Sequence, residues 1–491
     1  MSARNFRCLV RGSALAILLS LCLPAAGGCV LVSTRKTINQ QETAGDSSAG
    51  DAAKPRGTGG AYESTYLPLP SEPVLITNAI ILDGTGRRLD GASLLMRDGR
   101  IVAVGDAATD PEARVVDAGG AWVTPGIIDV HSHLGVYASP GVQATSDGNE
   151  STAPVTAEVW AEHSVWPQDP QFPLALAGGV TSMQILPGSA NLIGGRGVTL
   201  KNVPARTAQG MKFPGAPYGL KMACGENPKR VYGSKGRAPA TRMGNVAGYR
   251  SAWIAASEYR SKWQRYEEKV EKGDKAEAPK RDLKLETLAG VLDGEILVHN
   301  HCYRADEMAT MIQVAREFDY SISTFHHAVE AYKVADLLAE EGICAAMWAD
   351  WWGFKMEAYD GIRENVAMVE AAGACAIVHS DSAEGIQRLN QEAAKAMAAA
   401  NRAGIPVDPT TAIRWITLNA AQALGIAGET GSLEEGKMAD VVLWSGDPFS
   451  VYTRAEKVWV DGALLYDRQD PRRQPAMDFS IGSVANQEAG S

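Results

Sequence analysis

The stretch that decides the fold is an apolar run ending in two histidines, TPGIIDVHSH at residues 124–133. Its middle, Gly126–Val130, has the length and composition of a buried β-strand. Side chains at positions i and i+2 of a strand share a face, so His131 and His133 project into the same space. Neutral imidazoles bind divalent metals well, and two of them on one face predict a pair of metal ligands.

On the C-terminal side of this strand, short apolar runs alternate with amphipathic helical stretches such as Ala305–Phe318 and Gly385–Ala403. Eight strands with intervening helices predict a (β/α)8 TIM barrel over residues 123–425. A charged segment, Ser257–Glu286, interrupts the period and is interpreted as a solvated helical insertion. The strand candidates are Gly126–Val130, Gly179–Leu186, Gly197–Lys201, Gly219–Cys224, Ile296–His301, Tyr320–Phe325, Ile343–Trp348 and Ala374–His379.

The segments on both sides of the barrel region have the sequence pattern of β-hairpins. Asp98-Gly99 and Asp461-Gly462 each separate two short apolar runs, which is a strong hairpin signal. Residues 73–122 and 426–470 are therefore expected to form one small β-sandwich domain from the two ends of the chain.

The beginning of the chain looks like an export signal. Arg4, Arg7 and Arg11 precede an apolar run at residues 14–23 that is shorter than the ~20 residues of a membrane span. Residues 1–28 are predicted to be a signal peptide, and Cys29 resembles a bacterial lipidation site. An ordinary cleaved signal is the alternative, and both imply an exported protein, periplasmic or anchored to the membrane as a lipoprotein of a bacterium.

Composition limits the remaining segments and the partners. Residues 29–72 are rich in Gly, Ser, Thr and charge, which predicts a flexible linker, and residues 471–491 are expected to be a tail. The net charge of -10 argues against nucleic acid as a partner. The sequence leaves open whether the chain forms a homo-oligomer.

Four cysteines lie in the body of the chain. Their spacing fits neither a zinc knuckle nor a disulfide framework, so they are expected to be small buried apolar side chains. They are Cys224, Cys302, Cys344 and Cys375.

The histidines indicate where the chemistry lies. The chain has eight, and seven lie at or next to the carboxyl end of a predicted strand, where TIM-barrel active sites form. Asp381 follows the last strand, where a carboxylate can bind a metal and accept a proton from water. Beyond the first pair, the strand-end histidines are His299, His301, His326, His327 and His379.

These motifs resemble the amidohydrolase superfamily, in the branch of imidazolonepropionase-related and prolidase-like hydrolases. The resemblance rests on residues 125–133, on His327 with the following Glu330–Lys333, on His379–Ser382, and on the closing segments 417–421 and 431–442. It implies cleavage of a C–N bond in an amide, cyclic amide or dipeptide-like small molecule by metal-activated water. The implied cofactor is a divalent metal, zinc being expected, as one or two ions.

The resemblance also implies residue roles. His131, His133 and Asp381 would bind the more buried metal, with Asp381 as general base, and His301 and His327 would bind a second. A second group of histidines would lie behind the ligands and orient them: His299, His326 and His379.

Two metals would need a bridging anion from the fourth strand. Glu226 is favoured because a carboxylate can bridge directly. Lys221 is the alternative and would first have to be carbamylated, because an ammonium group cannot bind a metal. The aromatic pair Trp351-Trp352 is expected to help form the pocket wall.

Two other functions remain open. Related heterocycle deaminases usually carry a Glu three residues after the fifth-strand histidine, whereas here Arg304 follows His301 and Cys302 follows His299 at that spacing. A non-catalytic exported lipoprotein that binds a solute is the other alternative.

Overall fold

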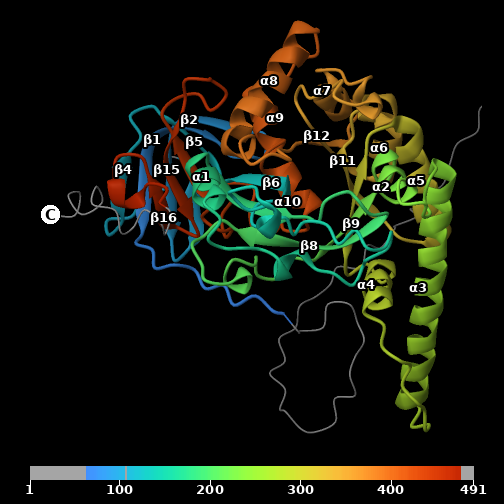
Figure 1. Ribbon diagram of the computed structural model, residues 1–491. Helices are drawn as coiled ribbons and strands as arrows, with labels where there is room; N and C mark the ends of the chain where they lie inside the picture. Colours follow the sequence, from blue (N-terminus) through green and yellow to red (C-terminus); the bar gives the residue numbers. More distant parts are fainter. Residues whose placement is uncertain (1–61, 106–107, 477–491) are drawn as a thin grey trace, which may run out of the picture. The chain divides into compact units, whose positions relative to one another are not determined.

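The computed structural model describes residues 62–105 and 108–476 (Figure 1). The predicted signal peptide, Cys29, most of the predicted linker and the end of the predicted tail lie outside these residues. Among the helices that are described, none combines the length and the apolar character needed to cross a bilayer.

The central element is an eight-stranded barrel sheet whose order follows the chain, from β6 to β13. It is nearly closed, and beyond the end of β13 the backbone N–H of Asp381 donates to the carbonyl of His131 in β6 at 3.1 Å. Together with the second sheet described below, this confirms the predicted fold class. The strands are β6 (Ile127–Ser132), β7 (Val180–Ile185), β8 (Ile193–Lys201), β9 (Gly219–Ala223), β10 (Leu297–Cys302), β11 (Ile322–His327), β12 (Cys344–Met347) and β13 (Cys375–Val378).

One barrel strand departs from the (β/α)8 pattern. β8 pairs antiparallel with both β7 and β9, whereas the other barrel pairs are parallel. Only residues 186–192 connect β7 to β8, and a parallel crossover needs about a dozen residues or more. The short connection therefore forces the hairpin, and β9 runs parallel to β7 again.

The helices lie mainly between the later strands. The predicted insertion corresponds to the second half of α3 and the start of α4, two helices that pack on each other. α4 begins where the Asp282 carboxylate accepts hydrogen bonds from the backbone N–H groups of Lys284 and Leu285. The helices are α1 (Gln171–Ala177), α2 (Glu226–Gly233), α3 (Arg242–Glu271), α4 (Leu283–Leu292), α5 (Ala305–Phe318), α6 (Ala335–Glu341), α7 (Asn365–Ala371), α8 (Leu389–Arg402), α9 (Pro409–Arg414) and α10 (Leu418–Ala423).

The second sheet combines strands from both ends of the described chain, which Figure 1 shows as blue and red arrows together. Its order is β16-β15-β14-β5-β1-β2-β3, with β4 pairing β1, and the antiparallel β5–β14 pair joins the early strands to the late ones. The strands are β1 (Val74–Leu82), β2 (Arg88–Arg97), β3 (Arg100–Val104), β4 (Arg114–Asp117), β5 (Trp122–Pro125), β14 (Val441–Trp444), β15 (Ala455–Val460) and β16 (Ala463–Asp467).

A buried ionic cluster connects the barrel to the second sheet. The Lys201 ammonium in β8 donates to the carboxylates of Asp440 and Asp461, and the Tyr66 hydroxyl also donates to Asp461. A charge this deeply buried is tolerated only when it is paired, so these residues fix the two sheets to each other.

The four body cysteines form two disulfides, so the expectation of unpaired buried thiols was wrong. Cys224 bonds Cys302 and Cys344 bonds Cys375, at separations of 78 and 31 residues. Each bond joins neighbouring barrel strands. The partners become neighbours only through β-α-β crossovers, which spacing along the sequence does not show.

Candidate metal centre

The strand-end histidines converge at the carboxyl end of the barrel. His131 lies in β6, His301 in β10 and His327 in β11, and His379 follows β13. Burial lowers the pKa of each of these imidazoles, to about 3 for His379. They are therefore neutral at physiological pH, which is the form that binds metals.

The tight half of the centre is defined as the three possible ligands His131, His133 and Asp381, together with the neighbouring Lys221. His133 Nε2 lies 3.3 Å from both His131 Nε2 and Asp381 Oδ1, and His131 Nε2 lies 3.6 Å from that oxygen. A tetrahedral zinc ion with bonds of about 2.0–2.1 Å has ligand atoms about 3.3–3.4 Å apart. The tight half thus has the spacing of a metal site.

Asp381 is ionised within this cluster. Burial acts to raise the pKa of its carboxyl, but the hydrogen bond and charge of His133 outweigh it, and the pKa is lowered. The carboxylate faces both imidazoles of the strand-end pair. It can therefore serve as a metal ligand, a proton acceptor, or both.

Of the two candidate bridging residues, Lys221 is the one beside the histidines. Its Nζ lies 3.3 Å from His131 Nε2, and burial lowers the pKa of its amine to about 7. Glu226 begins α2, and its Oε1 lies 3.8 Å from the Lys355 ammonium. Glu226 is not among the residues whose donor atoms cluster at metal-binding distance in the described chain.

The open half of the centre consists of His301 and His327. The rings lie 4.5 Å apart between centroids, and His327 Nδ1 is 3.8 Å from Asp381 Oδ2. The Nδ1 atoms of both histidines, and both ring nitrogens of His379, are buried without a hydrogen-bond partner among the described residues. Buried nitrogens without a partner are uncommon, and the donor atoms of His327 and His379 lie within 4.8 Å of each other and of His131, close enough to hold a metal ion.

Two of the site residues adopt a strained backbone. His327 and Asp381 have φ angles of 68° and 49°, in the left-handed region that non-glycine residues seldom occupy. Such a conformation costs about 1–3 kcal/mol and is concentrated at functional sites. The turns after β11 and β13 thus aim these two side chains at the centre.

A relay of histidines lies beneath the tight half. His131 Nδ1 is 2.9 Å from His326 Nδ1, and His326 Nε2 is 2.9 Å from His299 Nδ1. His299 Nε2 reaches the Gln184 side-chain amide at 3.2 Å. The relay contains two of the three histidines predicted to lie behind the ligands and ends at Gln184, which the sequence did not single out. The third, His379, is not in the relay: it has a donor atom within 4.8 Å of those of His131 and His327.

The relay determines which nitrogen of His131 can bind a metal. Because His131 Nε2 faces Asp381 and His133, its proton belongs on Nδ1, which donates to His326. His326 then donates to His299, and His299 donates to the Gln184 amide oxygen. That oxygen has no partner in residues 62–105 and 108–476, and half a turn of the amide presents it to His299.

Asp129 is another residue that sequence analysis missed. It is fully buried in β6 and accepts hydrogen bonds from the backbone N–H of His131 and from the backbone N–H and hydroxyl of Ser380. Burial raises the pKa of its carboxyl to about 7. Asp129 therefore ties the first strand to the turn that carries Asp381, and an Asp inside an apolar strand was its only sequence signal.

Aromatic rings hold the open half. Trp348 and Tyr303 both stack against His327, at centroid distances of 4.3 and 5.2 Å, and their own centroids lie 5.9 Å apart. Trp348 also donates its Nε1–H to the Ser380 carbonyl at 3.2 Å. The sequence singled out neither ring, because a lone Trp or Tyr after a strand resembles ordinary core.

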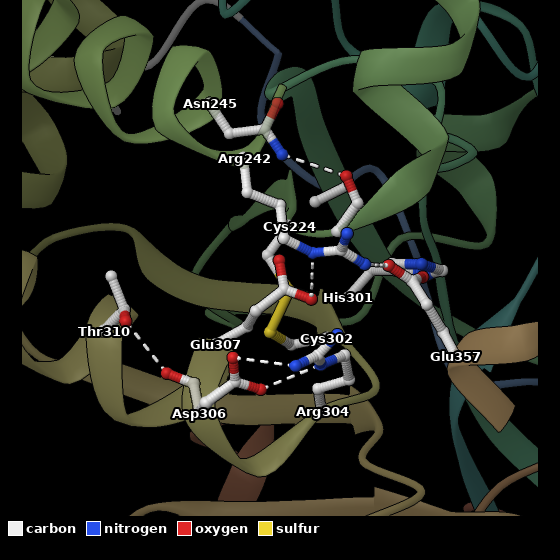
Figure 2. Close-up of a disulfide and its surroundings, with 12 residues drawn as sticks. Cys224, Arg242, Asn245, His301, Cys302, Arg304, Asp306, Glu307, Thr310 and Glu357 are labelled. Atoms are coloured by element: carbon white, nitrogen blue, oxygen red, sulfur yellow. Dashed lines mark hydrogen bonds and ion pairs between the residues drawn. A yellow bond between two sulfur atoms is a disulfide. The ribbon is translucent and has the colours of Figure 1, made fainter. Parts of the chain in front are cut away.

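The disulfide Cys224–Cys302 flanks the open half, as Figure 2 shows beside His301. Cys302 follows His301 directly, and Cys224 N–H donates to the His301 carbonyl at 2.8 Å. Nearby, Arg242 bridges Glu307 and Glu357. These bonds fix the backbone that carries His301.

Comparisons with known proteins point to one family. The model of the Amidohydrolase family matches residues 258–466. A crystal structure of an amidohydrolase from Thermotoga maritima MSB8 superposes with a TM-score of 0.74 at 35% identity, over 80% of this chain and all of that one.

Two curated relatives carry related names. The chain is 33% identical over 84% of its length to the amidohydrolase tasK of Hapsidospora irregularis, of which it spans only 45%. It is 26% identical over 79% of its length to an imidazolonepropionase of Mesorhizobium japonicum, spanning 94% of that protein. The chain belongs to the amidohydrolase family.

Proposed function

We propose that the chain is a metal-dependent hydrolase that cleaves the C–N bond of an amide, cyclic amide or dipeptide-like substrate with water. One observation carries this proposal. The donor atoms of His131, His133 and Asp381 lie within 4.8 Å of one another at the end of the barrel where family active sites form.

The donor set favours zinc, because imidazole nitrogens with one carboxylate suit this ion and match its ligand spacing. His131, His133 and Asp381 would hold one ion, and His301 and His327 a second. When bound, the metal supplies a Lewis acid that polarises the scissile carbonyl and makes water more acidic.

The chain's own residues supply the proton transfers. Asp381 is ionised, so its carboxylate accepts the proton of the attacking water and later donates it to the leaving nitrogen. Asp129 and Ser380 hold the turn that aims this carboxylate. Trp348 and Tyr303 exclude water from the buried side of His327.

We propose Lys221, rather than the Glu226 favoured by the sequence, as the bridging ligand. Its side-chain nitrogen lies 3.3 Å from His131 Nε2, and a pKa near 7 leaves much of the amine neutral at physiological pH. A neutral amine can add carbon dioxide and lose a proton to form a carbamate, which is an anion with two oxygens. Glu226 instead faces Lys355.

Neither alternative function gains a supporting observation. The position that holds a Glu in related deaminases is Arg304, which pairs with Asp306, and the corresponding residue after His299 is the disulfide-bonded Cys302.

We also propose that the protein works outside the cytosol, anchored through a lipid on Cys29 or free after signal cleavage. Two disulfides support an oxidising compartment. Metabolic labelling with a radioactive fatty acid, compared between the native chain and Cys29→Ser, distinguishes the two forms.

The function is tested on the purified chain by metal analysis and a hydrolysis screen of N-acyl amino acids, dipeptides and cyclic amides. We expect bound zinc and metal-dependent release of amine, with kcat lowered about a thousandfold in Asp381→Asn. Asp90→Asn, which alters an exposed carboxylate paired with Arg88, is the matched control. A metal-free protein, or equal activity of Asp381→Asn and native enzyme, contradicts the proposal.

A further inference from the structure

The loop after β12 exposes a cluster of large apolar side chains. Five lie within nine residues, from 351 to 359, whereas exposed apolar side chains elsewhere in the described chain are more scattered. Single exposed apolar residues are normal, but a cluster of them usually marks a binding surface. They are Trp351, Trp352, Phe354, Met356 and Tyr359, each between 41% and 79% exposed.

This cluster is continuous with the metal centre. Trp351 stacks on Trp348 at a centroid distance of 5.3 Å, and Trp348 stacks on His327 at 4.3 Å. Phe354 lies edge-on to Trp348 at 5.7 Å and to Tyr303 at 6.3 Å. Trp351 and Phe354 therefore extend to the surface the aromatic stack that begins at a predicted metal ligand.

The loop is ordered rather than loose. The N–H of Gly353 donates to the Ala358 carbonyl at 2.7 Å, and the Tyr332 hydroxyl donates to the Asp360 carbonyl at 3.1 Å. Lys333 pairs with the Asp360 carboxylate at 2.7 Å. The exposed rings are thus presented by a fixed backbone.

The charges around this loop are already balanced. Lys355 faces Glu226 and Glu357, and Arg242 bridges Glu357 and Glu307. The adjoining cleft of about 520 Å³ has equal numbers of acidic and basic side chains in its lining. These are Glu226, Glu330, Glu357 and Asp360 against Lys229, Arg242, Arg304 and Lys333. Apolar surface, and not an uncompensated charge, is therefore what the loop offers a ligand.

We infer that Trp351 and Phe354 bind an aromatic side chain of the substrate next to the scissile bond, so that the enzyme selects amides carrying a benzyl-like group. This inference rests on the proposed function and names its substrate class. The occupant is the substrate because both rings contact Trp348, and Trp348 in turn stacks on His327. A planar aromatic group can stack on Trp351 and meet the edge of Phe354, the two favoured geometries of aromatic pairs.

The test measures binding to the zinc-loaded full chain by calorimetry, with L-phenylalanine hydroxamate and L-alanine hydroxamate as probes. Both probes carry the same metal-binding group and differ only in a phenyl ring. We expect the phenylalanine probe to bind about tenfold more tightly, and the double variant Trp351→Ala, Phe354→Ala to bring the ratio of the two affinities close to one. Tyr452→Ala, which removes an 89% exposed ring from the loop between β14 and β15, should leave the ratio unchanged.

Each contrary result has a distinct meaning. Equal affinity of native enzyme for the two probes overturns the inference, and so does an unchanged ratio in the double variant. A double variant that keeps the ratio but no longer sediments with phosphatidylcholine vesicles makes the loop a membrane contact and also overturns it. Failure of the proposed function appears differently, as absence of zinc-dependent binding of either probe to the native chain, and it removes the inference as well.

Discussion

The two halves of the metal centre are built in different ways. In the tight half, two imidazoles alternate on one strand, and the donor atoms already lie 3.3–3.6 Å apart. In the open half, His301 and His327 come from different strands and are held by stacked rings and a disulfide. The Nδ1 atom of each has no partner within the described part of the chain. The comparison indicates that the tight half is preorganised for metal, whereas the open half is completed by what binds there.

Removing one ligand from each half should produce unequal losses. We expect His131→Ala to retain little zinc and to lower kcat at least about a thousandfold, because it removes the group at the middle of the tight half. His301→Ala should keep close to one ion per chain and lose less activity. Metal stoichiometry by mass spectrometry and steady-state kinetics check this. Complete loss of metal from His301→Ala would contradict the contrast between the halves.

Lys221 should connect the two halves, so its removal should have the next largest effect. We expect Lys221→Ala to lower kcat about a hundredfold and to retain metal in the tight half only. Added propionate should restore part of the activity, because a free carboxylate can replace a bridging carbamate. Native enzyme given ¹³C-bicarbonate should show a carbamate carbon by NMR. Glu226→Gln is the matched variant, and a larger loss in it than in Lys221→Ala would return the bridging role to Glu226.

The histidine relay should affect the tight half by a smaller factor. His326→Phe keeps the ring but removes the acceptor that fixes the proton of His131, and we expect zinc affinity to fall about 10–100-fold. Gln184→Leu acts two hydrogen bonds further away and should cost less. Competition with a fluorescent chelator measures the zinc affinity of both variants. An equal loss of affinity in the two would show that the effect does not weaken with distance along the hydrogen-bonded chain.

The smallest expected difference is between the two disulfides, of which one is near the metal centre and the other is far from it. Cys302 ends β10 beside His301, whereas Cys344 and Cys375 begin β12 and β13 at the opposite end of the barrel. Replacing either pair with serine should lower the free energy of unfolding by about 2–4 kcal/mol. Of the two double variants, only the one that combines Cys224→Ser with Cys302→Ser should also weaken metal binding in the open half, by several-fold. Denaturant unfolding and metal titration check this, and equal metal affinity in both double variants would show that the nearby disulfide has no role at the site.

The sequence predicted what is local and periodic. Alternation on one strand was enough to pair His131 with His133, and apolar runs located the barrel strands, because each signal lies within a few residues. The reversed direction of β8 depended on a connection too short for a crossover, which apolar patterning does not report.

Local sequence patterns could not predict which side chains meet across the barrel. The preference for Glu226 came from ligand chemistry alone, whereas the position of Lys221 depends on which face of β9 turns toward His131. The disulfide partners lie 78 and 31 residues apart and meet only when their strands pair. Gln184 could not be predicted for the same reason. Its strand, β7, has no histidine or cysteine, and its amide meets His299 only once the barrel has formed.

The second sheet has a consequence for synthesis on the ribosome. β5 and β1 leave the exit tunnel early, yet β5 pairs with β14, which is made more than 300 residues later. Pairing between segments so distant in sequence is slow, and the early strands present an unpaired edge in the meantime. A nascent chain should therefore need protection from aggregation until β14 emerges, and stop codons introduced before β14 should yield insoluble product even though the barrel is already complete.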